Sequence, residues 1–285
     1  MHRLIILAIV LSTAALAEST GGCGIEDTAI NEAFEDLYNF NFPAAHAVLD
    51  RYIVAHSQEA LPYAIRASAY LFYELDRLHI LESQFLISDK RIVEKKSLPP
   101  DPKVRTKLMQ ALEDAQSRAK VILAQHPDDR QALLALCIVE GVATDYMALV
   151  EKHQLASLLP ARRSNSYAQQ LLRMHPPCYD AYMTAGLSEY MVGSLPFFVR
   201  WFVHFDNVQG NRQQGVQKLQ LVAQEGHYFK SFAKILLAII YLREKKPHET
   251  EKLLAELAHD YPSNPLFRKE LARLETEPSA SRERN

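Results

Sequence analysis

The stretch SFAKILLAIIYLREKKPHETEKLLAELAHDYP, residues 231–262, decides the fold of this chain. Its apolar and small residues recur at helical spacing in two blocks, which predicts two amphipathic helices in succession. With Ser231 as position 1, the residues that define the pairing stand at positions 7, 8, 11, 20, 24, 27 and 32: Leu237, Ala238, Tyr241, Thr250, Leu254, Leu257 and Pro262. Position 8 is small because the two helices approach most closely there.

These positions resemble the tetratricopeptide repeat (TPR), a helical hairpin of about 34 residues. Lys234, at position 4, departs from the pattern. The same frame recurs upstream, with its closing position at Ser57, Pro127, Pro176 and His227. The last three lie 49 and 51 residues apart, so we place insertions between the two helices of the middle copies. The prediction is an all-α, TPR-like helical-hairpin solenoid (an α-α superhelix) with inserted, lengthened helices, more compact than a regular superhelix.

The chain divides into four predicted parts. Residues 1–17 form a signal peptide, because a basic start is followed by an apolar run too short to span a membrane and by the cleavage motif Ala15-Leu16-Ala17. Residues 18–27 form a flexible lead, 28–275 a single helical domain with its best repeats at 180–272, and 276–285 a disordered tail. Helices are expected at 28–40, 43–56, 60–87, 103–125, 129–152, 162–174, 179–192, 209–224, 229–244, 248–260 and 264–275. Export to the bacterial periplasm or cell envelope follows from the signal peptide.

Composition and motifs argue against several functions. The net charge is −2, and no clustered Lys/Arg stripe suits nucleic acid. The sequence has no HExxH, CxxC or GxSxG and no phosphate-cradling glycine loop, so we expect no enzyme, cofactor or metal site. Glu140 and Glu189 share position 11 of successive repeats, and we expect them to bond a Tyr or an Arg between helices rather than to act as a catalytic pair.

Three cysteines are present, and an odd number cannot all be paired within the chain. Cys137 takes the small position 8, which predicts a buried, hydrophobic role. Cys178 follows two prolines at a helix entry. Cys23 follows Gly21-Gly22, but the lipobox position three residues before it holds Thr20, so lipid attachment there is disfavoured.

Three further blocks carry a narrower resemblance: residues 190–196, Gly210–Gly215 and Gly226–Phe229. They resemble a Gly/Ser-Leu-Leu-Pro turn and a Gly-x-Arg-x-x-Gly helix start in the tetratricopeptide repeat protein 39 and inclusion-body-clearance family and its exported bacterial relatives. The resemblance covers about residues 180–272. It implies a helical scaffold with no known chemistry.

In TPR proteins the first helix of each repeat lines a concave groove through positions 2, 5, 9 and 12. Here these positions are much more apolar than a groove that clamps a charged peptide end. Either inserted segments fill the groove and make it core, or it receives an apolar helix or an acyl-type ligand. The candidate groove residues are Leu61, Ala64, Ser68, Asp180, Met183, Leu187, Tyr190, Phe232, Ile235 and Ile239.

A second candidate surface is the aromatic segment Leu195–Phe205. Four of its side chains share one helical face: Phe198, Trp201, Phe202 and Phe205. Such a helix either caps the groove or docks on a partner or a membrane surface, which would be a peripheral contact only.

The function predicted from the sequence is an exported, non-enzymatic TPR scaffold that binds another protein or peptide in the bacterial cell envelope. The alternative is a carrier that binds an apolar small molecule or lipid in the helical groove. Both hypotheses place the working surface on the concave face.

Overall fold

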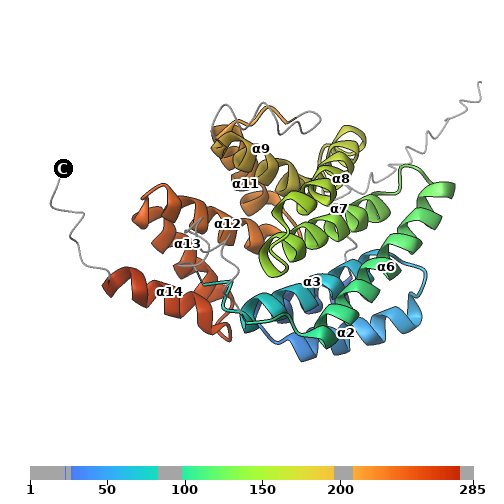
Figure 1. Ribbon diagram of the computed structural model, residues 1–285, viewed down its shortest axis with the longest axis horizontal. Helices are drawn as coiled ribbons and strands as arrows, with labels where there is room; N and C mark the ends of the chain where they lie inside the picture. Colours follow the sequence, from blue (N-terminus) through green and yellow to red (C-terminus); the bar gives the residue numbers. More distant parts are fainter. Residues whose placement is uncertain (1–22, 24–26, 83–97, 196–207, 277–285) are drawn as a thin grey trace, which may run out of the picture.

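The computed structural model describes residues 23, 27–82, 98–195 and 208–276 of the chain (Figure 1). Every element in this part of the chain is helical, which confirms the all-α prediction. The elements are α1 (Thr28–Tyr38), α2 (Phe42–Ala55), α3 (Leu61–Arg77), α6 (Pro102–Gln125), α7 (Arg130–Asp145), the π-helix η1 (Tyr146–Val150), α8 (Gln154–Met174), the 3-10 helix η2 (Tyr179–Ala181), α9 (Tyr182–Ser194), α11 (Arg212–Glu225), α12 (Lys230–Arg243), α13 (Pro247–Asp260) and α14 (Pro265–Thr276).

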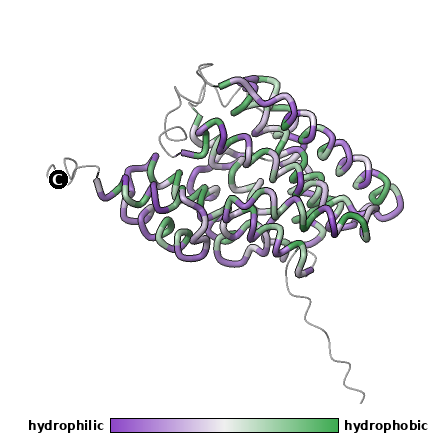
Figure 2. The backbone as a smooth tube through the Cα atoms, turned by 90° about the horizontal axis from the view of Figure 1, so that it is seen from below, coloured by the Kyte–Doolittle hydropathy of each residue, from purple (hydrophilic) through white to green (hydrophobic). Residues whose placement is uncertain are grey.

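The helices pair in chain order into hairpins that stack on one another, which makes the protein a helical solenoid (Figure 1). We call the first helix of each hairpin the A helix and the second the B helix. The A helices are α1, α3, α7, α9 and α12, and their B partners are α2, α6, α8, α11 and α13. Apolar and polar segments alternate along the helical tubes in Figure 2, as expected where each helix buries one face.

The extra length of the middle repeats lies between their A and B helices. In the third hairpin, η1 extends α7 and α8 runs for 21 residues. Residues 83–97 and 196–207, which separate A from B in the second and fourth hairpins, lie outside the described part. The predicted helix over 60–87 is too long, because α3 ends at Arg77 and His79 takes a left-handed conformation (φ 57°) just beyond it. The predicted start at residue 162 is too late, since α8 includes Pro160.

Glycines allow a close helix contact between α9 and α11. A Cβ added to Gly186, at position 8, would lie 3.0 Å from the carbonyl oxygen of Gly215. A Cβ added to Gly215 would lie 2.6 Å from the backbone nitrogen of Tyr190. Gly193 packs in the same way against Gly210. Gly186, the small residue at position 8, therefore allows the two helices to approach closely, as the repeat pattern predicts.

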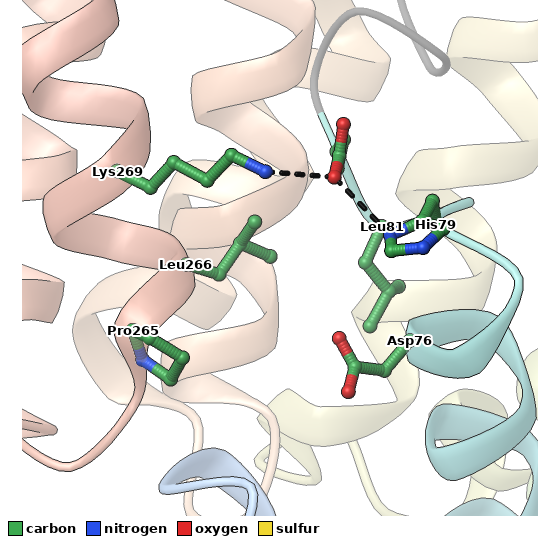
Figure 3. A pocket seen from close by; sticks show the side chains of 7 residues that line it. Asp76, His79, Leu81, Pro265, Leu266 and Lys269 are labelled. Atoms are coloured by element: carbon green, nitrogen blue, oxygen red, sulfur yellow. Dashed lines mark hydrogen bonds and ion pairs between the residues drawn. The ribbon is translucent and has the colours of Figure 1, made fainter.

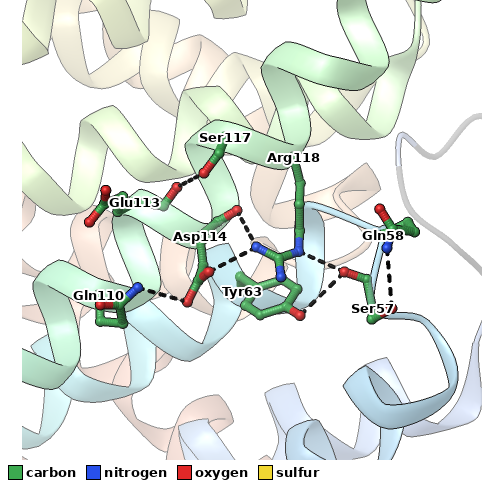
Figure 4. A network of polar contacts seen from close by, with 8 residues as sticks. All are labelled: Ser57, Gln58, Tyr63, Gln110, Glu113, Asp114, Ser117 and Arg118. Carbon is green, nitrogen blue, oxygen red and sulfur yellow. Dashed lines mark hydrogen bonds and ion pairs between the residues drawn. The ribbon is translucent and has the colours of Figure 1, made fainter.

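Arg118 joins the second hairpin to the turn before it (Figure 4). Its guanidinium lies over the ring of Tyr63, 3.8 Å from the centroid, and its Nε donates to the carbonyl of Ser57 at 2.6 Å. The Tyr63 hydroxyl donates to the same carbonyl at 3.3 Å, and Asp114 accepts from the guanidinium at 2.9 Å. One B-helix arginine thereby fixes the start of its own A helix.

Candidate functional site

Half of the predicted groove residues are buried, so at those positions the side chains belong to the core and do not line an accessible groove. Their exposed fractions are 5% or less, as expected for side chains packed at the density of a protein interior. The buried members are Leu61, Ala64, Asp180, Met183 and Tyr190. Phe232 and Ile235 are half-buried against the core, and the Phe232 ring meets Phe72 of α3 edge to face at 5.5 Å.

Two predicted groove residues keep the character of a docking surface. Leu187 of α9 and Ile239 of α12 occupy the same repeat position, 9, on successive A helices. Both are half-buried, and within the described residues neither belongs to a hydrophobic core cluster. Ser68, at position 9 of α3, is also half-buried, and its hydroxyl donates to the carbonyl of Ala64. Position 9 is thus half-buried on α3, α9 and α12, whereas Ile138, at position 9 of α7, is buried in the core.

An N-terminal segment, which we call the strap, contacts the starts of later helices of the solenoid. We define the strap as Cys23, α1 and Asn39. It crosses the starts of three successive A-type helices, α9, α12 and α14, and it touches each of them at one repeat position, 34: Cys178, Phe229 and Asn264. Cys23 forms a disulfide with Cys178. Asn264 Nδ2 donates to the carbonyl of Tyr38 at 2.8 Å, and the backbone N–H of Ser263 donates to Asn39 Oδ1 at 3.1 Å.

Tyr228, beside the middle junction, is the centre of this contact. The ring of Phe34 stacks on the Tyr228 ring with centroids 4.7 Å apart, and the Tyr38 hydroxyl donates to the Tyr228 carbonyl at 2.8 Å. Phe34 and Tyr38 stand one helical turn apart, so both point from the same face of α1. Burial raises the pKa of Tyr38 well above its usual value, so its hydroxyl stays protonated and keeps donating.

Asp180 serves this junction and is not a surface groove residue. Its Oδ1 accepts from the backbone N–H groups of Tyr228 and Phe229 at 3.1 and 2.9 Å, which fixes the entry to α12. Its Oδ2 is buried, and among the described residues it has no hydrogen-bond partner. Burial raises the pKa of the Asp180 carboxyl, and the two backbone hydrogen bonds oppose that rise.

A disulfide fixes Cys23, which lies between the predicted signal peptide and the helical domain. Cys23, placed by the sequence in a flexible lead, is 2% exposed and bonded to Cys178, whose Cα lies 4.7 Å from its own. A sulfur in a disulfide cannot carry a thioether-linked lipid, so lipid attachment at Cys23 is incompatible with this state. Cys137 is the free, buried cysteine, as expected, with its sulfur 3.1 Å from the hydroxyl oxygen of Thr184.

The two carboxylates at repeat position 11 have structural partners. Glu140 accepts from Arg163 Nε at 2.8 Å, which matches the expected bond between helices. Glu189 accepts from the backbone N–H groups of Gly210 and Asn211 at 2.9 and 3.0 Å, and so fixes the start of α11. Across the described residues, no group of His, Cys, Asp and Glu side chains could hold a metal ion.

A shallow pocket of about 190 Å³ lies between the turn after α3 and the start of α14 (Figure 3). Asp76, His79 and Glu82 line it from the end of α3 and the turn beyond, and Lys269 of α14 bonds Glu82 across it at 2.8 Å. The pocket is smaller than the 300–1,000 Å³ typical of a site for a drug-sized ligand. The ion pair between Lys269 and Glu82 joins α14 to the turn after α3.

The aromatic docking surface at Phe198, Trp201, Phe202 and Phe205 lies outside the described residues. Within them, the stretch Arg130–Val150 is long and apolar enough to cross a membrane by length and composition alone. Of its most apolar window, 61% is buried inside the protein, and α7 packs on α3, α6 and α8. Its apolarity is that of a core helix.

No family model matches this chain, and neither a curated protein nor a solved structure matches it significantly. The resemblance to TPR proteins therefore stays a prediction from the residues.

Sequence reasoning missed the strap. The signals were present: an aromatic pair one turn apart in α1, the pair Tyr228-Phe229 at a repeat junction, and two cysteines beside segment starts. What the sequence does not show is how tightly the solenoid winds. That curvature decides whether the first A helix reaches the later repeat junctions.

Proposed function

We propose that this protein is an exported, non-enzymatic TPR scaffold that recruits another protein through the open part of its concave face in the bacterial envelope. The observation that carries the proposal is the pair Leu187 and Ile239. Two equivalent positions on successive A helices hold apolar side chains that are half-buried yet outside the core. Regularly spaced apolar anchors of this kind suit the helix-in-groove mode of recognition.

Two features support the remaining parts of the proposal. The Cys23–Cys178 disulfide fits an oxidising compartment outside the cytoplasm, in agreement with the predicted signal peptide. The buried carboxylates Glu140 and Glu189 each hold a neighbouring segment in place through hydrogen bonds, which supports a structural role for both.

The test is capture of partners from the native envelope fraction by the immobilised protein, read by quantitative mass spectrometry. Leu187→Asp with Ile239→Asp should abolish capture of the polypeptide that the native protein enriches, because a charge there cannot be buried against an apolar helix. The matched control is Val121→Asp on the B helix α6, where the side chain is 61% exposed and away from the A helices. Unchanged capture by the double variant, with its helical content intact, would contradict the proposal.

The alternative proposal, a carrier for an apolar small molecule, rests on the same apolar concave positions. Native mass spectrometry of the protein from its own envelope separates the two. A co-purifying polypeptide supports the scaffold, whereas a bound lipid or metabolite mass without protein supports the carrier.

A further inference from the structure

Besides packing on α2 as the A helix of the first hairpin, the strap helix α1 contacts later repeat junctions of the solenoid. It is a single amphipathic helix whose buried residues are Ile30, Ala33, Phe34, Leu37 and Tyr38. Its partners at the later junctions lie 190 to 226 residues away in the sequence. Two aromatic side chains one turn apart supply the ring contacts, and a backbone carbonyl and a side-chain amide bond the C-terminal end of the helix. This is the chemistry of helix-in-groove recognition, supplied from within the chain.

We propose that α1 is an intramolecular occupant of a helix-docking surface formed by Tyr228, Phe229, Tyr261 and Asn264, and that the Cys23–Cys178 disulfide is the latch that holds it there. With the latch closed, α1 excludes other helices. With the latch open, the surface accepts a partner helix of the same kind: amphipathic, with two aromatic residues one turn apart. This inference rests on the proposed scaffold function and adds the partner class and its control.

The latch works through effective concentration. The chain connection to α2 tethers α1 at its C-terminal end in either state. The bond at Cys23 adds a second tether at the N-terminal end, so a competing helix in solution must displace one that is held at both ends. Without the bond, α1 is held at its N-terminal end by non-covalent contacts alone, and the partner competes on more equal terms. The unpartnered Oδ2 of Asp180, beside Tyr228, offers an acceptor to a donor on the incoming helix.

Opening the latch consumes an external dithiol. One of its thiolates attacks a sulfur of the Cys23–Cys178 bond, that bond breaks, and a mixed disulfide forms with release of the other cysteine as a thiolate. The second thiol of the reductant then displaces the cysteine from the mixed disulfide. Cys23 and Cys178 gain two electrons and two protons in all, and the reductant leaves as its own disulfide. Both cysteines are 2% exposed, so the attack requires the strap to lift first and the closed state is long-lived.

The test uses a fluorescein-labelled synthetic peptide of residues 27–41 and measures its binding by fluorescence anisotropy. The oxidised native protein should not bind it. The Cys23→Ser variant should bind the peptide at least about tenfold more tightly, which corresponds to about 1.4 kcal/mol of binding free energy. Cys137→Ser, which changes a cysteine outside the latch, should exclude the peptide as the native protein does. A peptide with Phe34→Ala and Tyr38→Ala should bind neither form.

A second variant covers the case in which Cys23→Ser does not fold. Cys178→Ser breaks the same bond from its other side, so it should admit the native peptide while keeping its helical content. Equal binding to oxidised native protein and Cys23→Ser, or no binding to either folded variant, would overturn the latch. Because the probe is a peptide of this chain, these outcomes do not depend on finding the partner that the Leu187 and Ile239 variants test.

Discussion

Breaking the Cys23–Cys178 disulfide should lower the free energy of unfolding by about 5 kcal/mol in the loop-entropy model. The two cysteines are 155 residues apart, so the bond closes more than half of the chain into one loop. The entropy that such a loop removes from the unfolded chain grows with the logarithm of its length, which gives this value at 25 °C. The strap's non-covalent contacts with Tyr228 and Asn264 remain after the bond is gone, so the folded state keeps its shape.

The assay is guanidinium unfolding followed by far-UV circular dichroism, for Cys23→Ala, Cys178→Ala and the double variant. Each single change already breaks the bond, so all three should lose nearly the same free energy. Two independently packed cysteines would instead give losses that add. A loss below about 1 kcal/mol, or additive losses, would refute the reasoning that the bond acts through the unfolded chain.

Two other predictions follow from packing and from burial. Gly215→Ala should lower the free energy of unfolding by several kcal/mol, because its Cβ would meet the Tyr190 nitrogen at 2.6 Å. Gly141→Ala should be neutral or stabilising by up to about 1 kcal/mol, because its Cβ would make ordinary contact with Ser164 at 3.8 Å. Thermal unfolding of the two variants checks this, and equal effects would contradict it. Burial raises the pKa of Asp145 to about 7, so the folded protein binds a proton that the unfolded chain has released, and stability should fall as pH rises from about 4 to about 7. Asp145→Asn should flatten that slope in unfolding curves measured across pH, and an unchanged slope would exclude this carboxyl as its source.

The helices themselves could be predicted from the sequence because their signals are local. The spacing of Leu237, Ala238 and Tyr241 marks an A helix, and the structure places α12 over the same residues. The predicted helix boundaries were wrong where the surrounding structure overrides a local sequence preference. Pro160 lies inside α8, although a proline normally argues for a helix end.

The concave face was predicted only in part, because exposure depends on the curvature of the whole solenoid. Leu187 and Met183 both stand at groove positions of α9, yet one stays half-buried outside the core and the other is 5% exposed within it. Sequence position fixes the face of a helix on which a residue lies. It does not fix whether α1 or another A helix covers that face.

The covalent link of the strap, Cys23–Cys178, can be measured directly. Native protein from its own envelope fraction is digested without reduction, with free thiols blocked first, and the fragments are mapped by mass spectrometry. We expect one linked fragment pair containing Cys23 and Cys178, together with a blocked, unpaired Cys137. A free or lipid-modified Cys23, or a bond from Cys23 to Cys137, would contradict it.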